Sequence, residues 1–147
     1  MKRGELAPDF ELPDTDGVPV RLSTLLQAGP VVLFFYPLAS SGGCTAEMCS
    51  VRDAADRFVA AGARRIGISR DSVAAQRAFA EANDLGFPLL ADVDGVVCES
   101  YGVRRNLAAA PVKRRTIVIG SDGIVQDVVK SELRMGKHVD GALQALA

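Results

Sequence analysis

The segment from Tyr36 to Asp53, with the sequence YPLASSGGCTAEMCSVRD, contains the residues best suited to chemistry. Cys44 follows the glycine pair at 42–43 and is expected to stand at the start of a helix. Helix N-termini expose unpaired N–H groups and carry a partial positive charge. That field favours the thiolate, the nucleophilic form of cysteine, and glycines let the backbone approach a small ligand closely. The segment therefore predicts a reactive cysteine at a helix N-terminus.

Two further side chains near Cys44 have candidate roles. Ser41 is expected to cap the helix by accepting from the N–H of Gly43 or Cys44, and its hydroxyl could also orient a ligand oxygen above the sulfur. Cys49 is about 100° around the helix from the apolar centre at Met48, so we expect it nearer to solvent than Cys44. The residues alone leave an alternative to a reactive role for each cysteine. Cys44 could be a small hydrophobic residue on the buried face, and Cys49 could be an ordinary helical cysteine.

These residues need elements that hold them in place. The apolar run at 31–36, which Pro37 stops, predicts a strand covered on both faces. A helix is expected over 44–61, with Gly62 past its end, and its buried face should comprise Met48, Val51, Ala55, Phe58 and Val59. A second helix, capped by Asp71 or Ser72, should run to Asn83. The remaining strands are predicted at 65–69, 87–91, 116–119 and 124–130, and the remaining helices at 96–101 and 138–147.

The order of these elements predicts the fold class. Strands that alternate with helices indicate an α/β layer fold, and the turn at 121–123 adds an antiparallel hairpin that makes the sheet mixed. The Asp-Gly turn within 14–17 predicts a hairpin of short strands near the N-terminus. The length fits one core, and no linker or repeat interrupts it, so residues 1–147 are expected to form a single domain.

Composition excludes several function classes. The chain has 147 residues, 48% of them hydrophobic, and a net charge of −1 with both signs mixed along the sequence. Without a basic stripe, a nucleic-acid partner is not expected. No apolar run reaches the roughly 18–20 residues that span a membrane, and no secretory signal is expected at the N-terminus. The expected location is the cytoplasm.

The cysteine count points away from a scaffold role. There are three cysteines, Cys44, Cys49 and Cys98, and an odd number argues against a disulfide framework. A reducing cytoplasm favours buried or reactive cysteines instead. Zinc sites normally use four Cys or His ligands in spaced pairs, and the one histidine, His138, lies far along the chain, so no metal site is expected. Cys98 stands in a short apolar stretch and is expected to be buried and structural.

The reactive segment resembles the active-site segment of the peroxiredoxin family. The matching residues are Tyr36-Pro37, Gly43-Cys44-Thr45, Glu47, Cys49 and Arg52-Asp53, and the chain is most similar to the subfamily called peroxiredoxin Q or bacterioferritin comigratory protein. The likeness covers nearly the whole chain, including stretches 7–14, 87–92, 101–103 and 114–123. It implies a thioredoxin-like fold, with a central mixed β-sheet flanked by helices and an N-terminal β-hairpin extension.

The resemblance implies roles for residues of the segment. Cys44 matches the peroxidatic cysteine, Cys49 the resolving cysteine on the same helix, and Pro37 the proline that shields the sulfur. Ser41 stands where the family usually has threonine, which keeps the hydroxyl but loses the stiff rotamer. Gly42 replaces a proline next to Gly43, which predicts a looser loop, and Gly120 stands where an aspartate commonly ends the strand. These departures bear on rate more than on reaction class.

An arginine is also implied. Arg114 matches the arginine that faces the thiolate, and Glu47 matches a glutamate that braces it. Arg115 is the competing candidate, because neighbours in a strand starting near Thr116 point in opposite directions. A solvated basic cluster of Lys113, Arg114 and Arg115 is the remaining alternative.

The implied reaction is peroxide reduction by a thiol. The Cys44 thiolate attacks a hydroperoxide, hydrogen peroxide or organic, and becomes a sulfenic acid that condenses with Cys49. Arg114, Ser41 and the N–H groups of the helix start stabilise the leaving oxygen. Thioredoxin or a similar dithiol reduces the disulfide. No metal, flavin or haem is required, and the subfamily resemblance favours a monomer.

Two other functions are weighed against this one. A thioredoxin-like disulfide reductase needs Cys-x-x-Cys, whereas four residues separate Cys44 from Cys49. A non-enzymatic redox sensor would use the same sulfenic chemistry, but it would be oxidised once and would need a protein client.

The spacing of the two cysteines predicts motion. In an α-helix, residues five apart are about 7.5 Å apart along the axis and about 140° around it, which puts their Cα atoms roughly 8–9 Å apart. A disulfide needs Cα atoms within about 7 Å. We therefore expect the segment 41–52 to be helical when reduced and locally unfolded when Cys44 and Cys49 are joined.

Overall fold

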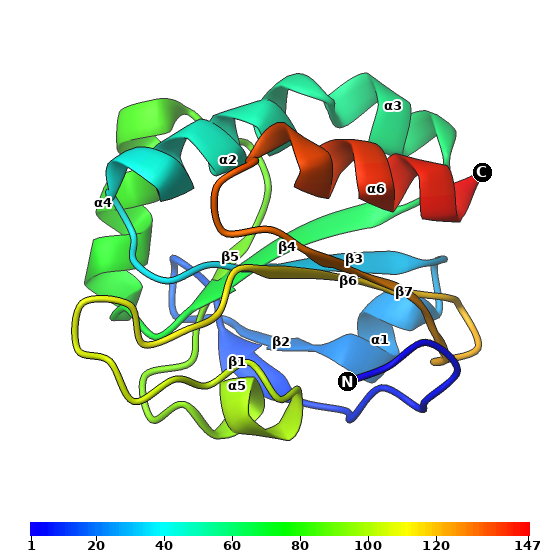
Figure 1. The fold of residues 1–147 in the computed structure, drawn as a ribbon, viewed down its shortest axis with the longest axis horizontal. Helices are drawn as coiled ribbons and strands as arrows, with labels where there is room; N and C mark the ends of the chain where they lie inside the picture. The colour runs from blue at the N-terminus through cyan, green and yellow to red at the C-terminus, as the bar shows by residue number, and fades with distance from the viewer.

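A five-stranded sheet forms the centre of the molecule, with helices on both faces (Figure 1). The computed structural model describes residues 1–147. The strand order is β5-β4-β3-β6-β7, and the strands are β3 (Val31–Phe35), β4 (Arg64–Ser69), β5 (Leu89–Ala91), β6 (Arg115–Ile119) and β7 (Val125–Lys130). β3, β4 and β5 are parallel, whereas β6 is antiparallel to β3 and to β7. The predicted mixed sheet is confirmed.

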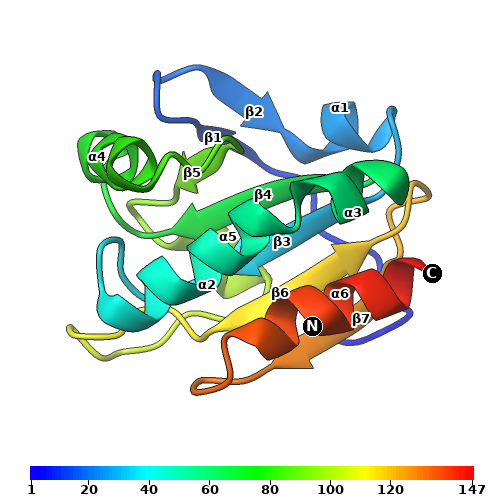
Figure 2. The same ribbon diagram turned by 90° about the horizontal axis from the view of Figure 1, so that it is seen from above.

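The helices divide between the two faces of this sheet (Figures 1 and 2). One face carries α2 (Gly42–Asp53), α3 (Ala55–Ala60) and α6 (Gly136–Leu146), with α4 (Val73–Asn83) beside β5. The other carries α5 (Val96–Ser100), α1 (Leu22–Leu26) and the predicted N-terminal hairpin of β1 (Glu11–Pro13) and β2 (Pro19–Arg21). None of these helices is long and apolar enough to cross a membrane.

The central strand explains why both faces are covered. All five residues of β3 are fully buried. Val32 and Phe34 belong to the core beneath α2, α3 and α6, and the other three belong to the core on the opposite face. A strand buried on both faces reads as a continuous apolar run, which is how 31–36 was interpreted.

The predicted helix over 44–61 is wrong in one respect, because it is two helices. The chain breaks at Ala54, whose φ of −90° and ψ of 12° are not helical. After the break, Phe58 packs edge-to-face on Phe34 with ring centroids 6.1 Å apart. The break also moves the buried face: Ala54 is buried and Val59 is 72% exposed, whereas Ala55 and Val59 were expected to face the core.

The element α1 was also missed, because no helix was expected between the N-terminal hairpin and the strand at 31–36. The helix α2 begins at Gly42, two residues before the expected start. The other elements lie where predicted to within three residues at either end. The parallel strands β3 and β4 end at the same edge of the sheet, and the loop between β3 and α2 leaves from that edge.

Candidate active site

Cys44 lies in the first turn of α2 and is fully buried. Ser41 is the N-cap, and its Oγ accepts from the Cys44 N–H at 3.3 Å. Its carbonyl oxygen accepts from the Thr45 N–H at 2.8 Å, as the first bond of the helix. The cap satisfies N–H groups that the helix leaves unpaired, and the N-terminal partial charge of a 12-residue helix acts directly on the sulfur.

A side chain just beyond the neighbouring strand holds the loop that carries Ser41, in a role that the sequence analysis missed. Asp71 lies just beyond β4, and its Oδ2 accepts from the Ala39 N–H at 2.8 Å and from the Ser69 hydroxyl at 2.6 Å. Pro37, at the start of the loop, is buried. The carboxylate therefore pins the middle of the loop to the neighbouring strand and limits the freedom that Gly42 adds. The sequence did contain one signal for this contact. Neighbouring parallel strands end at the same edge of a sheet, so the residues that follow them lie close together.

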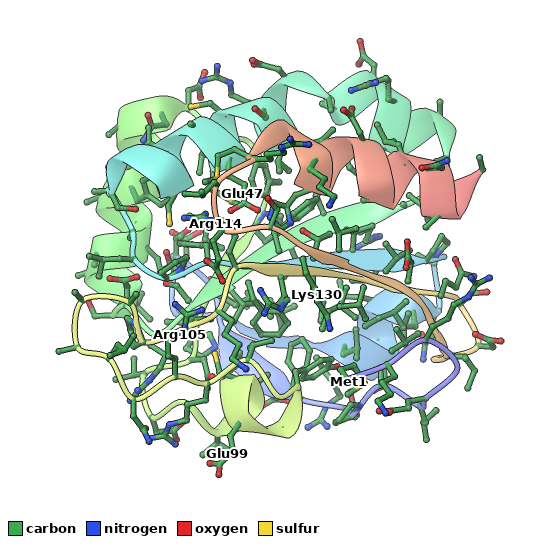
Figure 3. The ribbon with its side chains drawn as sticks, viewed as in Figure 1. Met1, Glu47, Glu99, Arg105, Arg114 and Lys130 are labelled. Carbon is green, nitrogen blue, oxygen red and sulfur yellow. The ribbon has the colours of Figure 1, made fainter.

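Arg114, rather than Arg115, points at the cysteine. Its Nη2 is 3.3 Å from the Cys44 Sγ, and its Nη1 donates to Glu47 Oε1 at 2.6 Å. Figure 3 shows Arg114 and Glu47 directed toward one another between the sheet and α2. The Arg114 side chain is only 6% exposed. Burial acts to lower the pKa of Arg114, but Glu47 and Cys44 outweigh it and the net shift is upward.

Arg115 is directed elsewhere. Its Nη1 donates to the Arg114 carbonyl oxygen at 2.8 Å and pairs with Glu132 Oε1 at 3.2 Å. Glu132 also accepts from the Arg114 backbone N–H at 3.2 Å. The solvated basic cluster considered above is therefore not what forms, because Arg114 is buried while Arg115 joins a surface ion pair.

Gly43 is required by close packing. A Cβ built on this residue would meet Arg114 Nη2 at 3.2 Å and Met135 Cε at 3.5 Å. The first contact is tighter than ordinary van der Waals distance, so a side chain here would require the guanidinium to shift by a few tenths of an ångström. Glycine thus allows the helix start and Arg114 to approach one another.

Glu47 lies one turn further along α2 and is fully buried. Burial raises its pKa to about 7, although the neighbouring Arg114 acts in the opposite direction. Its Oε1 accepts from Arg114, whereas its Oε2 has no hydrogen-bond partner. A carboxyl with a pKa this near neutrality changes charge in the range where enzymes work.

His138 is the second residue that the sequence analysis missed as part of the site. It lies on α6 and is fully buried. Its Nδ1 is 2.8 Å from Thr116 Oγ1 and 3.8 Å from Glu47 Oε2, and its Nε2 is 2.7 Å from the Ser131 carbonyl oxygen. Burial lowers the pKa of His138. The ring thus connects α6, β6 and the preceding loop beside Glu47.

Cys49 is half-buried, so it lies nearer to solvent than Cys44 as predicted. Its Sγ is 3.8 Å from Asn83 Oδ1 at the end of α4. The Asn83 carbonyl oxygen accepts from Arg52 Nη1 at 2.7 Å. Both cysteines are free and belong to one continuous helix, so they cannot bond in this conformation.

Cys98 stands apart from this cluster. It is buried beneath the other face of the sheet, and its N–H donates to Asp92 Oδ2 at 2.7 Å. Burial, with the adjacent Asp92 carboxylate, raises the pKa of the Cys98 thiol. A thiol that resists ionisation is a poor nucleophile.

Taken together, the geometry suits attack by a thiolate on a small electrophile. A sulfur at a helix N-terminus, with a guanidinium at 3.3 Å, has positive charge placed to receive negative charge on a leaving atom. A buried glutamate fixes the guanidinium in position.

Comparisons with known proteins point to one family. The AhpC/TSA family profile matches residues 3–128. A Mycobacterium tuberculosis protein named as a peroxiredoxin is 51% identical, with 99% of this chain and 96% of that protein covered. A chloroplastic peroxiredoxin Q of Sedum lineare is 38% identical, with 99% and 78% covered. The crystal structure of peroxidoxin BcpB from Mycobacterium tuberculosis superposes with a TM-score of 0.95 at 51% identity, covering 99% of this chain and 96% of that one.

Proposed function

This chain belongs to the AhpC/TSA family, and from that membership we propose that it reduces hydroperoxides with Cys44 as the attacking residue. Relatives named peroxiredoxin match almost its full length, so it is a peroxidase, and its resemblance to peroxiredoxins is confirmed. The observation that carries the assignment of Cys44 is the 3.3 Å approach of Arg114 Nη2 to a buried sulfur at a helix N-terminus.

The first step is oxidation of the thiolate. A lone pair of the Cys44 sulfur attacks the terminal peroxide oxygen, the S–O bond forms, and the O–O bond breaks. The leaving oxygen gains negative charge, which Arg114 and the N–H groups at the start of α2 are placed to stabilise. In this proposal Ser41 orients the peroxide through its hydroxyl, and buried Pro37 keeps water from the sulfur.

The second step joins the sulfenic acid of Cys44 to Cys49. Condensation forms the S–S bond and releases water. Support for this role comes from the position of Cys49 on the same helix, half-exposed, where local unwinding would free it. A thioredoxin-like dithiol then reduces the disulfide by thiol exchange.

We propose that residues 1–147 act as one domain, since both apolar clusters pack on the same sheet. The monomeric state and the cytoplasmic location stay predictions from the sequence.

Steady-state peroxide consumption tests the proposal, with thioredoxin, its reductase and NADPH as the reducing system. The protein should consume many equivalents of hydrogen peroxide and of an organic hydroperoxide. Cys44→Ser should consume none, and Cys49→Ser should stop after about one equivalent because its sulfenic acid has no internal partner. A wild-type protein that stops after one equivalent would instead be a redox sensor.

A further inference from the structure

One guanidinium serves two acidic groups in the buried site. Arg114 contacts Glu47 Oε1 at 2.6 Å with Nη1 and the Cys44 sulfur at 3.3 Å with Nη2. Glu47 and Cys44 are fully buried, and Arg114 nearly so. If thiolate and carboxylate were both charged, the cluster would hold one negative charge in excess. An uncompensated charge away from water is costly, and buried groups avoid it by changing protonation.

His138 does not supply the missing positive charge. Its Nε2 is 2.7 Å from the Ser131 carbonyl oxygen, which can only accept, so Nε2 carries a proton. In the neutral ring, Nδ1 then has a lone pair and accepts from the Thr116 hydroxyl at 2.8 Å. Burial lowers the pKa of His138, and the nearby positive charge of Arg114 acts in the same direction. The imidazole therefore stays neutral beside Glu47.

The second oxygen of Glu47 consequently has no hydrogen-bond donor beside it. Oε2 lies 3.8 Å from the unprotonated Nδ1 and has no hydrogen-bond partner. The charged or titratable groups around Glu47 are Arg114 just before β6, His138 on α6 and Glu132 in the loop before α6, with Cys44 on the same helix sharing Arg114. Burial raises the pKa of Glu47 to about 7, and Glu132 adds to that shift. A proton on Glu47 removes the excess charge.

We propose that Glu47 is protonated while Cys44 is a thiolate and ionises when Cys44 is oxidised, so that the buried cluster stays neutral through the first step. This inference rests on the function proposed above. In the balanced step the reactants are the Cys44 thiolate, the hydroperoxide and the Glu47 carboxylic acid. The products are the Cys44 sulfenic acid, an alcohol or water, and the Glu47 carboxylate. Cys44 loses two electrons to the O–O bond. The leaving oxygen takes a proton from solvent, and Glu47 returns one to solvent.

The proton count distinguishes this mechanism from simple thiolate oxidation. Without Glu47, converting a thiolate to a neutral sulfenic acid consumes one proton for the leaving oxygen. With Glu47 coupled, proton uptake cancels. Glu47 would then act as a positioning residue. It would accept a hydrogen bond from Arg114 as a neutral carboxylic acid before the reaction and form an ion pair with Arg114 after it.

Stopped-flow oxidation with a pH-indicator dye measures this count. The Cys49→Ser protein is used so that the reaction ends at the sulfenic acid, and the ultraviolet absorbance of the thiolate reports its loss. At about pH 8, above the pKa of about 7 that burial gives Glu47, the carboxyl can ionise once the thiolate charge is gone, and the parent should take up close to no protons. Glu47→Gln, which keeps an oxygen for Arg114 but cannot ionise, should take up about one proton per Cys44. Glu99→Gln, which alters an exposed carboxylate in α5 on the other face of the sheet, is the matched control and should behave as the parent.

An infrared difference spectrum between reduced and oxidised parent protein gives a measurement that needs no Glu47 variant. It should show the loss of one protonated carboxyl band. Uptake of a full proton by the parent, equal uptake in Glu47→Gln, or no change in the carboxyl band each overturns the inference. Mass spectrometry of a trapped sulfenic acid separates the two proposals, because failure to oxidise Cys44 at all would refute the peroxidase assignment of this residue instead.

Discussion

The sulfur of Cys49 lies 3.8 Å from the side-chain oxygen of Asn83, the last residue of α4. The carbonyl oxygen of the same residue accepts from Arg52. Asn83 thus ties α2 to a neighbouring helix at the point where the proposed cycle requires α2 to open.

Asn83→Ala is expected to speed disulfide formation. The variant removes the acceptor for the Cys49 thiol, and losing about 0.5–1 kcal/mol from the closed helix should raise the rate roughly two- to fivefold. Stopped-flow fluorescence or acid-quench mass spectrometry measures this step after peroxide addition. Oxidation of Cys44, which does not involve Asn83, is the internal control and should be unchanged. An unaltered or slower disulfide step would show that this contact does not restrain the helix.

The adjacent arginines form a matched pair for mutation. Arg114→Lys should lower the second-order rate of Cys44 oxidation by about 10²-fold or more, because lysine cannot contact both the sulfur and Glu47. Arg115→Lys should stay within about twofold, since its ion pair with Glu132 lies at the surface. A large loss of rate in both variants would contradict the geometry, which places only Arg114 at the sulfur. A small loss in both variants would remove Arg114 from the mechanism.

Local unfolding of α2 is tested by hydrogen exchange on the reduced and disulfide forms. The amides from Met48 to Arg52 should lose protection in the disulfide form, because Cys44 and Cys49 cannot bond across an intact helix. The amides of α6 should be equally protected in both forms. If the α2 amides exchange at the same rate in the two states, Cys49 is not the resolving residue.

Cys98 is expected to be dispensable. Its thiol is buried and its pKa is raised, so a thiol reagent should modify Cys98 only after unfolding. Cys98→Ser should keep nearly full peroxide turnover, with some loss of stability because a hydroxyl replaces sulfur in an apolar core. Failure of this variant to recycle would assign the resolving role to Cys98.

The buried pair of His138 and Glu47 predicts how stability depends on pH. Burial lowers the pKa of His138 below its ordinary 6.5, so the unfolded chain binds more protons as acid is added and stability falls. Burial raises the pKa of Glu47 from 4.5 to about 7, so between these values the native state binds the extra proton and stability rises as pH falls. The two contributions oppose one another.

Glu47→Gln removes one side of this balance. Between about pH 7 and about pH 5 the variant should lose more stability than the wild type, by at least about 1 kcal/mol, because one pKa unit corresponds to about 1.4 kcal/mol. Urea unfolding at both pH values provides the measurement. Parallel pH profiles would mean that Glu47 is already ionised in the folded protein.

What could be predicted from sequence depended on how far apart the interacting residues are. Ser41, Cys44 and Cys49 lie within one helix start, so local spacing located them. Strand alternation says that Arg114 and Arg115 point in opposite directions, but it does not say which of them faces Cys44. Only the family resemblance favoured Arg114, which the structure places against the sulfur. Tertiary packing decides such a choice, because either residue can begin a strand.

The residues that sequence reasoning missed have distant partners. Asp71 contacts Ala39 across 32 positions, and His138 contacts Thr116 across 22. No local pattern distinguishes a carboxylate that pins a loop from one that caps a helix, and a lone histidine on an apolar helix face resembles ordinary core. The break at Ala54 was missed for a related reason, since the apolar spacing continues through it, and the contact that follows it, Phe58 on Phe34, joins residues far apart in the chain.

That break at Ala54 has a consequence for how the protein can evolve. Because α3 is held on the sheet by Phe58 while α2 is a separate helix, opening of α2 is a small cooperative event that leaves the rest of the fold intact. Substitutions on the exposed side of α2 can therefore change turnover with little effect on global unfolding, and substitutions around Phe58 can change global unfolding with little effect on turnover. Selection can adjust speed and durability separately in a chain this short.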